Sequence, residues 1–146
     1  MARATRIAGL FALLVYMLVA GDSSQALADT GLRTAPIHQL RIYEIFEQNK
    51  QAFHERFRDH AARIMAKYDF KILAMWESKT AERTEFVYLL EWPDTQTMKD
   101  RWSRFMADPE WAEIKKKTAA AHGALVGRIE DRVLQMTAYS PQTLVR

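Results

Sequence analysis

The sequence contains no cysteine, which excludes catalytic thiols, thiolate metal sites and disulfide bonds and leaves the cellular compartment open. Its five glycines form no glycine-rich phosphate loop, and its four histidines show no zinc-ligand spacing. The net charge of +3 is too small to indicate a nucleic-acid partner. These absences leave a chain of 146 residues, 49% hydrophobic, which is enough for one globular domain.

The first 28 residues have the features of a secretory signal. Arg3 and Arg6 precede an apolar run over residues 7–20, and Ala26-Leu27-Ala28 has the small-x-small form of a cleavage site. The run is shorter than the ~20 residues of a membrane-spanning helix. We expect cleavage after Ala28 and a periplasmic or secreted chain without stable membrane insertion. An uncleaved membrane anchor is the alternative.

The rest of the chain predicts a linker, one domain and a short tail. Residues 29–36 are a polar connector, residues 37–141 carry the periodic patterns, and residues 142–146 form a loose tail. Strand-like alternation and helical stripes predict the order strand, helix, strand, strand, helix pair, strand. The predicted ranges are 37–46, 49–68, 70–77, 85–92, 95–121 and 128–139.

The helix pair is the stretch around which the fold is organised. Its first helix has an apolar face that includes Trp102 and Phe105, and Asp108-Pro109-Glu110 predicts that a second helix starts at once. Trp102, Phe105 and Trp111 need an apolar partner surface, which we expect the sheet to supply. Core packing is the simplest role for these aromatics.

This order is the split βαβ arrangement, so the sequence predicts an α+β, ferredoxin-like βαββαβ fold. It has a four-stranded antiparallel sheet with helices on one face. The strands are apolar on both sides, so the face without helices is expected to expose more apolar surface than a soluble monomer normally shows. We therefore expect two copies to pack sheet to sheet as a homodimer.

Several segments resemble the NIPSNAP family. The run from Trp102 through the Asp108-Pro109-Glu110-Trp111 junction is the most specific, and residues 40–43, 75–77, 123–126 and 129–130 also match. The resemblance covers roughly residues 37–141 and implies a dimeric α/β barrel. It supplies no catalytic residues, because none is established across the family. Eukaryotic relatives have mitochondrial and membrane or vesicle partners, which do not transfer to a chain with an export signal.

Five strand residues are candidates to bind a ligand in the space that such a dimer encloses: Arg41, Tyr43, Trp76, Tyr88 and Trp92. Tyrosine and tryptophan combine an apolar body with a hydrogen-bonding tip, and a guanidinium pairs with carboxylate or phosphate. The alternative is that they only fill the interface. No metal site and no cofactor are predicted.

Other titratable groups favour the surface. A buried carboxylate among Glu44, Glu77 and Glu91 could act as a base with a raised pKa, although strand ends are more often solvated. The run at residues 115–117 is three lysines, for which a solvated helix face is expected.

Two functions remain open. The first is an exported, dimeric module that binds a small apolar or acidic ligand, favoured because no nucleophile–base pair or metal set is present. The second is a cofactor-independent oxygenase or isomerase, which rests on fold analogy alone. An interaction partner at a membrane surface is a weaker third, because the net charge is low.

Overall fold

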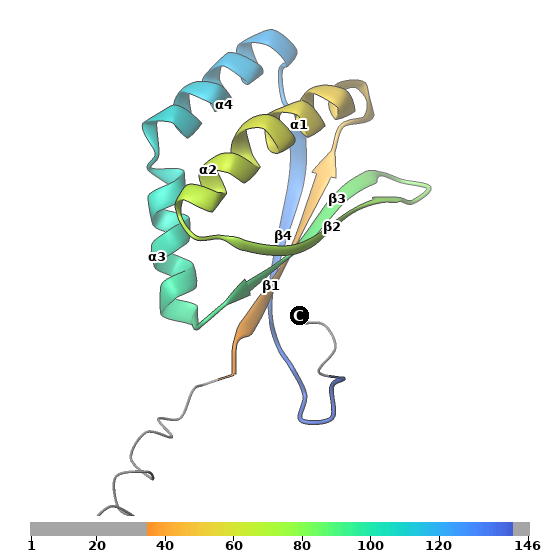
Figure 1. The fold of residues 1–146 in the computed structure, drawn as a ribbon. Helices are drawn as coiled ribbons and strands as arrows, with labels where there is room; N and C mark the ends of the chain where they lie inside the picture. The colour runs from red at the N-terminus through yellow and green to blue at the C-terminus, as the bar shows by residue number, and fades with distance from the viewer. Residues whose placement is uncertain (1–34, 142–146) are drawn as a thin grey trace, which may run out of the picture. The chain divides into compact units, whose positions relative to one another are not determined.

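The computed structural model describes residues 35–141 and confirms the α+β fold with the predicted element order (Figure 1). The strands form one antiparallel sheet in the order β2-β3-β1-β4. They are β1 (Ile37–Ile45), β2 (Lys71–Lys79), β3 (Thr84–Trp92) and β4 (Val126–Gln135). The predicted signal peptide, most of the predicted linker and the tail lie outside the described residues.

All helices lie on one side of the sheet, which we call the inner side (Figure 1). The helices are η1 (Glu47–Asn49, a 3₁₀ turn), α1 (Lys50–Arg56), η2 (Phe57–Ala61, a π-helix), α2 (Ala62–Lys67), α3 (Thr95–Met106) and α4 (Pro109–His122). The first four follow one another as a single helical segment between β1 and β2. No helix within residues 35–141 is long and apolar enough to cross a membrane.

The helix pair begins and ends as its capping residues dictate. Asp94 accepts a hydrogen bond at 2.7 Å from the backbone N–H three residues on, and Asp108 accepts one at 3.1 Å from the N–H of Trp111. Pro109 occupies the first position of α4, where its missing N–H costs nothing. Gly123, at φ +74°, ends that helix. These contacts confirm the predicted junction between the two helices.

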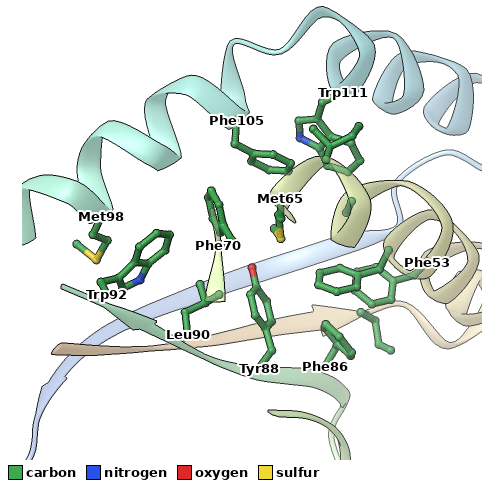
Figure 2. Packing of buried hydrophobic residues seen from close by; sticks show 14 of the residues in the cluster. Phe53, Met65, Phe70, Phe86, Tyr88, Leu90, Trp92, Met98, Phe105 and Trp111 are labelled. Carbon is green, nitrogen blue, oxygen red and sulfur yellow. The ribbon is translucent and has the colours of Figure 1, made fainter. Parts of the chain in front are cut away.

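The core lies between the inner side of the sheet and the helices, as Figure 2 shows. Alternate residues of β3 point into it because successive strand side chains face opposite sides. They are Phe86, Tyr88, Leu90 and Trp92, each at most 6% exposed. Phe53 and Phe57 meet Phe86 from the helices, with ring centroids 5.2 and 4.6 Å away.

A β-bulge in β2 changes which side its residues face. Ile72 pairs with Leu90, whose side chain is inner, but the register shifts before Ala74. Trp76 consequently pairs with Val87 on the outer side and is 50% exposed. An extra residue in a strand moves every later side chain to the opposite face.

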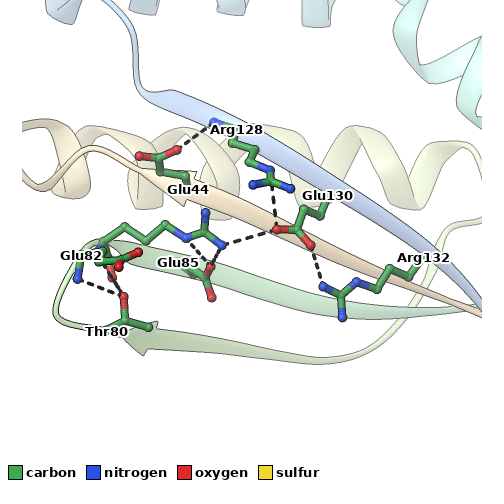
Figure 3. Close-up of polar contacts among 8 residues, drawn as sticks. Glu44, Thr80, Glu82, Glu85, Arg128, Glu130 and Arg132 are labelled. Atoms are coloured by element: carbon green, nitrogen blue, oxygen red, sulfur yellow. Dashed lines mark hydrogen bonds and ion pairs between the residues drawn. The ribbon is translucent and has the colours of Figure 1, made fainter.

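The outer side of the sheet carries an apolar band between two charged ends. The band lies on β1, β2 and β3 and consists of Leu40, Ile42, Trp76, Val87 and Leu89. On β4 the charged residues Glu130 and Arg132 pair with Ile42 and Leu40, and Leu134 pairs with His38. At one end, Arg83 reaches from beside Glu85 to Glu130 of β4, which also pairs with Arg132 (Figure 3). No helix of the described chain covers this band.

Three local details differ from the sequence-based prediction. The first long helix contains the π-helical turn η2, and the last strand ends at Gln135 rather than at residue 139. Asn49 does not cap α1 with its side chain. Its amide instead donates to the carbonyl oxygens of His122 and Ala124, at 2.9 and 2.8 Å, and so holds the end of α4 beside the first helix.

Candidate functional site

A partly open cavity of about 380 Å³ lies between the inner side of β1 and β4 and the helices. This volume is within the range of small-molecule sites. The walls are mainly aromatic and aliphatic. Among residues 35–141, three cations line the cavity and no carboxylate does. The lining residues are Arg41, Tyr43, Phe53, Arg56, Phe57, Ala61, Met65, Trp102, Phe105, Met106, Trp111, Lys115, Val126 and Ile129.

The helix pair supplies one aromatic wall. The rings of Phe105 and Trp111 stack with centroids 5.2 Å apart, and Trp102 meets Phe105 edge-on at 5.8 Å. The opposite wall includes Phe57 and Ala61, the first and last residues of the π-helix η2. Single π-turns of this kind are frequent at functional sites, so the interrupted helix geometry at the cavity is consistent with a functional role.

Arg41 is the polar centre of the site. Its Nη1 lies 2.8 Å from Oδ2 of Asp131, and its Nη2 donates to the hydroxyl oxygen of Tyr43 at 3.2 Å. The guanidinium carbon lies 4.6 Å from the ring centroid of Trp102, a cation–π contact. Burial lowers the pKa of Arg41, but its phenol and carboxylate neighbours raise it by more, so the guanidinium stays charged. Its buried Nε has no hydrogen-bond partner within residues 35–141.

A pair of phenols stands beside this arginine. The hydroxyl oxygens of Tyr43 and Tyr88 are 2.9 Å apart, and their rings meet edge-on at 5.4 Å. Tyr88 is fully buried under the helices, and burial raises its pKa well above the ordinary value. Tyr88 is therefore a neutral phenol at physiological pH.

Two further cations border the cavity around one indole ring. The guanidinium carbon of Arg56 and the Nζ of Lys115 lie 5.7 and 5.8 Å from the ring centroid of Trp111. Arg56 donates to the hydroxyl of Thr118 at 3.1 Å, and its burial lowers its pKa, yet arginine remains a cation in proteins. Neither cation pairs with a carboxylate in the described part of the chain. The solvated helix face expected for the lysine run holds for Lys116 and Lys117, which are exposed, whereas Lys115 is partly buried and lines the cavity.

Gln39 holds the tryptophans in place and is missed by sequence reasoning. Its side-chain oxygen accepts hydrogen bonds from the indole N–H groups of Trp92 and Trp102, at 3.0 and 2.7 Å. Its amide nitrogen donates to Asp131 at 2.9 Å. Gln39 is 1% exposed and occupies an inner position of β1. A polar residue at an inward-facing position of the strand pattern is the sequence feature by which it could have been identified.

The five predicted ligand-binding residues lie on both sides of the sheet. Arg41 and Tyr43 line the cavity, and Tyr88 lies just behind Tyr43. Trp92 is buried in the core beside Phe70, whereas Trp76 faces the outer side. The expectation that all of them face a space between two subunits is therefore wrong: four of the five lie beneath the helices of their own chain.

The carboxylates considered as bases do not enter the cavity. Glu77 accepts a hydrogen bond from Lys50 at 2.8 Å, which with the neighbouring His54 lowers its pKa, the opposite of what a general base needs. Glu44 accepts a hydrogen bond from the backbone N–H of Arg128. Glu91 lies on the outer side of β3, away from the cavity, and pairs with Lys71.

The comparisons with known proteins identify the family. The NIPSNAP family model matches residues 38–141, which is most of the chain. The chain belongs to the NIPSNAP family. Among curated proteins, none matches this sequence.

Solved structures of NIPSNAP proteins share the fold. An uncharacterized NIPSNAP-like domain protein from Burkholderia xenovorans is 21% identical, with a TM-score of 0.62 over 73% of this chain and 89% of its own. A NIPSNAP family protein from Agrobacterium tumefaciens is 18% identical, with a TM-score of 0.64 over 74% of this chain and 99% of its own. At these identities the likeness establishes the fold, and the function has to be argued from the cavity.

Proposed function

We propose that this NIPSNAP domain is a binding module that holds a small apolar or acidic molecule in the cavity between its helices and its sheet. The observation that carries the proposal is the cavity itself, which the described part of the chain lines with aromatic walls and three cations but no carboxylate. A concave site with apolar walls and a few convergent polar groups is the usual form of a ligand site.

The proposed ligand site can be tested with a substitution that fills the cavity. Ala61 lines it and is 2% exposed, so Ala61→Phe places a ring in the ligand's space. Ala66→Phe, on the exposed side of α2, is the matched control. Aromatic and apolar carboxylic acids are screened by thermal shift, since a ligand at 100 times its Kd stabilises a protein by about 2.7 kcal/mol.

We expect the wild type and Ala66→Phe to show the same ligand-induced rise in Tm and Ala61→Phe to show none. Overpacking costs about 1–3 kcal/mol, so each variant is compared with its own ligand-free baseline. An equal rise in all three proteins would refute the proposed site.

We also propose that two copies pair through the outer apolar band to form a homodimer. The band is apolar at its centre and flanked by charged groups, which is the anatomy of a protein interface. A second copy of the chain is the best-supported partner for this band, because a two-fold axis places the same band of each copy opposite the other. Although Tyr43, Tyr88 and Trp92 lie under the helices, the outer side still exposes apolar side chains, with Trp76 50% and Leu134 41% exposed.

Sedimentation equilibrium tests the dimer. Val87→Glu places a charge at the centre of the band, whereas Ala112→Glu places one on the exposed side of α4 as a control. We expect the wild type and the control to have twice the mass of one chain and Val87→Glu to be a monomer. A monomeric wild type at micromolar concentration would contradict the homodimer while leaving the cavity in place.

A second candidate activity is cofactor-independent oxygenation or isomerisation in the same cavity. The chain of hydrogen bonds from Arg41 through Tyr43 to Tyr88 favours it, because it places polar groups at an otherwise apolar site. An enzyme would lose kcat, and not only affinity, on Tyr43→Phe. A binding module would show no turnover in either protein.

We further propose that the chain is exported after removal of residues 1–28. The charged start, apolar run and Ala26-Leu27-Ala28 site support this. Intact mass of the protein from its host should begin at Asp29, and a retained Met1 would contradict it.

A further inference from the structure

Arg41, which lines the cavity, has one buried donor that no group within residues 35–141 accepts. Of the three nitrogens of Arg41, Nη1 pairs with Asp131 and Nη2 donates to Tyr43. The buried Nε–H has no partner within the described residues. Leaving a buried donor unpaired is costly, so this guanidinium has the capacity to bind one further acceptor.

The direction of the phenol hydrogen bond supplies a second donor. Tyr88 is fully buried, and in residues 35–141 its hydroxyl has Tyr43 as its hydrogen-bond partner. If Tyr43 donated, the hydrogen of Tyr88 would be left unpaired in the core, so Tyr88 donates instead. The oxygen of Tyr43 then accepts from both Tyr88 and Arg41. The hydrogen of Tyr43, whose side chain lines the cavity, is left for a third partner.

The charge around these donors favours one negative charge on the ligand. Arg56 and Lys115 line the same cavity without a carboxylate partner in the described chain, and no acidic residue is part of the lining. The charge of Arg41 is already balanced by Asp131 at 2.8 Å. A multiply charged phosphate would have to enter between the rings of Trp102, Phe105 and Trp111, where its hydration is lost.

Building on the proposed ligand site, we propose that the cavity selects an apolar monocarboxylic acid in its ionised form. Its carboxylate oxygens accept hydrogen bonds from the hydroxyl of Tyr43 and from the Nε–H of Arg41. Because this Nε is buried in the ligand-free chain, the guanidinium has to turn toward the cavity when the ligand binds. Its apolar body lies against the aromatic wall of the helix pair. Arg56 and Lys115 stabilise the anion electrostatically and bind no particular atom.

The experiment compares two ligands of one shape, 2-naphthoate and its neutral amide, 2-naphthamide, by isothermal titration calorimetry. The proteins are the wild type, Arg41→Gln, Tyr43→Phe and Ala61→Phe. Arg58→Gln is the control, because Arg58 is an exposed arginine that pairs with Asp59. Far-UV circular dichroism and a cooperative thermal transition establish that each variant is folded. If Arg41→Gln does not fold, Tyr43→Phe alone is sufficient to test the proposal.

In the wild type and in Arg58→Gln, we expect the acid to bind at least about tenfold more tightly than the amide, the order expected for charge-assisted hydrogen bonds. In Arg41→Gln and Tyr43→Phe, the acid should lose about tenfold while the amide changes less than about twofold. Equal binding of acid and amide to the wild type would overturn the inference. An equal loss of both ligands in the variants would also overturn it, because the residues would then only shape the cavity.

The cavity-filling variant separates this inference from the proposed function. If acid and amide bind equally and Ala61→Phe blocks both, the ligand site stands and the selection for an anion is wrong. If Ala61→Phe binds the acid as tightly as the wild type does, the ligand binds elsewhere and both proposals are wrong. If neither ligand binds at about 1 mM, a weak limit for a ligand site, both are also wrong.

Discussion

Replacing Gln39 by methionine tests whether one buried amide organises the tryptophans at the site. Methionine has a similar length, so the change removes the polar atoms and leaves little cavity. It leaves the indole N–H of Trp92, which is 1% exposed, without its acceptor at 3.0 Å. It does the same to Trp102, whose acceptor is at 2.7 Å, but this half-buried indole can regain water.

The magnitude follows from these two exposures. A buried donor left unpaired costs about 1–3 kcal/mol, and an ordinary hydrogen bond contributes about 0.5–1.5 kcal/mol net. We therefore expect Gln39→Met to lower the free energy of unfolding by about 2–4 kcal/mol, a large part of the 5–15 kcal/mol typical of a domain. Gln51→Met, at an exposed position of α1, should change it by less than about 0.5 kcal/mol.

Urea unfolding with intrinsic fluorescence measures both variants, and an unchanged m-value supports a two-state comparison. The double variant Gln39→Met/Trp102→Phe should lose less than the sum of the single variants, because each removes one end of the same hydrogen bond. A loss below about 0.5 kcal/mol for Gln39→Met, or strict additivity in the cycle, would refute the reasoning.

Three further predictions concern the framework of the site. Asp108 accepts from Tyr68 at 2.7 Å and from Lys67 at 2.9 Å, which hold its pKa well below the ordinary value. Its contribution to stability is present above the pKa of the unfolded chain, near 4, and is lost as the pH falls toward the lower folded pKa. In Asp108→Asn, the free energy of unfolding measured with urea should therefore depend less on pH between about pH 5 and pH 2. An unchanged pH dependence would contradict the lowered pKa of Asp108. Gly123→Ala should cost about 1–3 kcal/mol by thermal unfolding, because φ +74° strains any residue with a Cβ; a smaller loss would show that the α4 terminus adapts. Tyr88→Phe should weaken 2-naphthoate binding, because Tyr43 loses the donor that directs its hydrogen into the cavity; unchanged affinity, measured by calorimetry, would count against that direction.

The fold is largely readable from the sequence because its signals are local. The stripes of the first helix, the alternation of β3 and the Asp108-Pro109 junction are each set within a few residues, and each predicts the element observed. The site is less readable because it depends on register. The bulge after Ile72 is a one-residue insertion that no propensity marks, and it alone moves Trp76 to the outer side.

The cationic lining of the cavity is likewise a tertiary property. Arg56 and Lys115 are separated in the sequence and meet only because α1 and α4 bring them to the same indole ring, that of Trp111. Arg41 could be identified from the sequence, since a charged residue at an inner strand position needs a partner. Gln39 occupies the same kind of position and carries the same signal.

The most direct test of the cavity as an acid-binding site is a crystal structure of the protein with 2-naphthoate. The account predicts naphthyl density between the helices and the sheet, with a carboxylate oxygen about 2.7–2.9 Å from the Nε of Arg41. Naphthoate bound on the outer side of the sheet, or bound in the cavity with that Nε still unpaired, would contradict it.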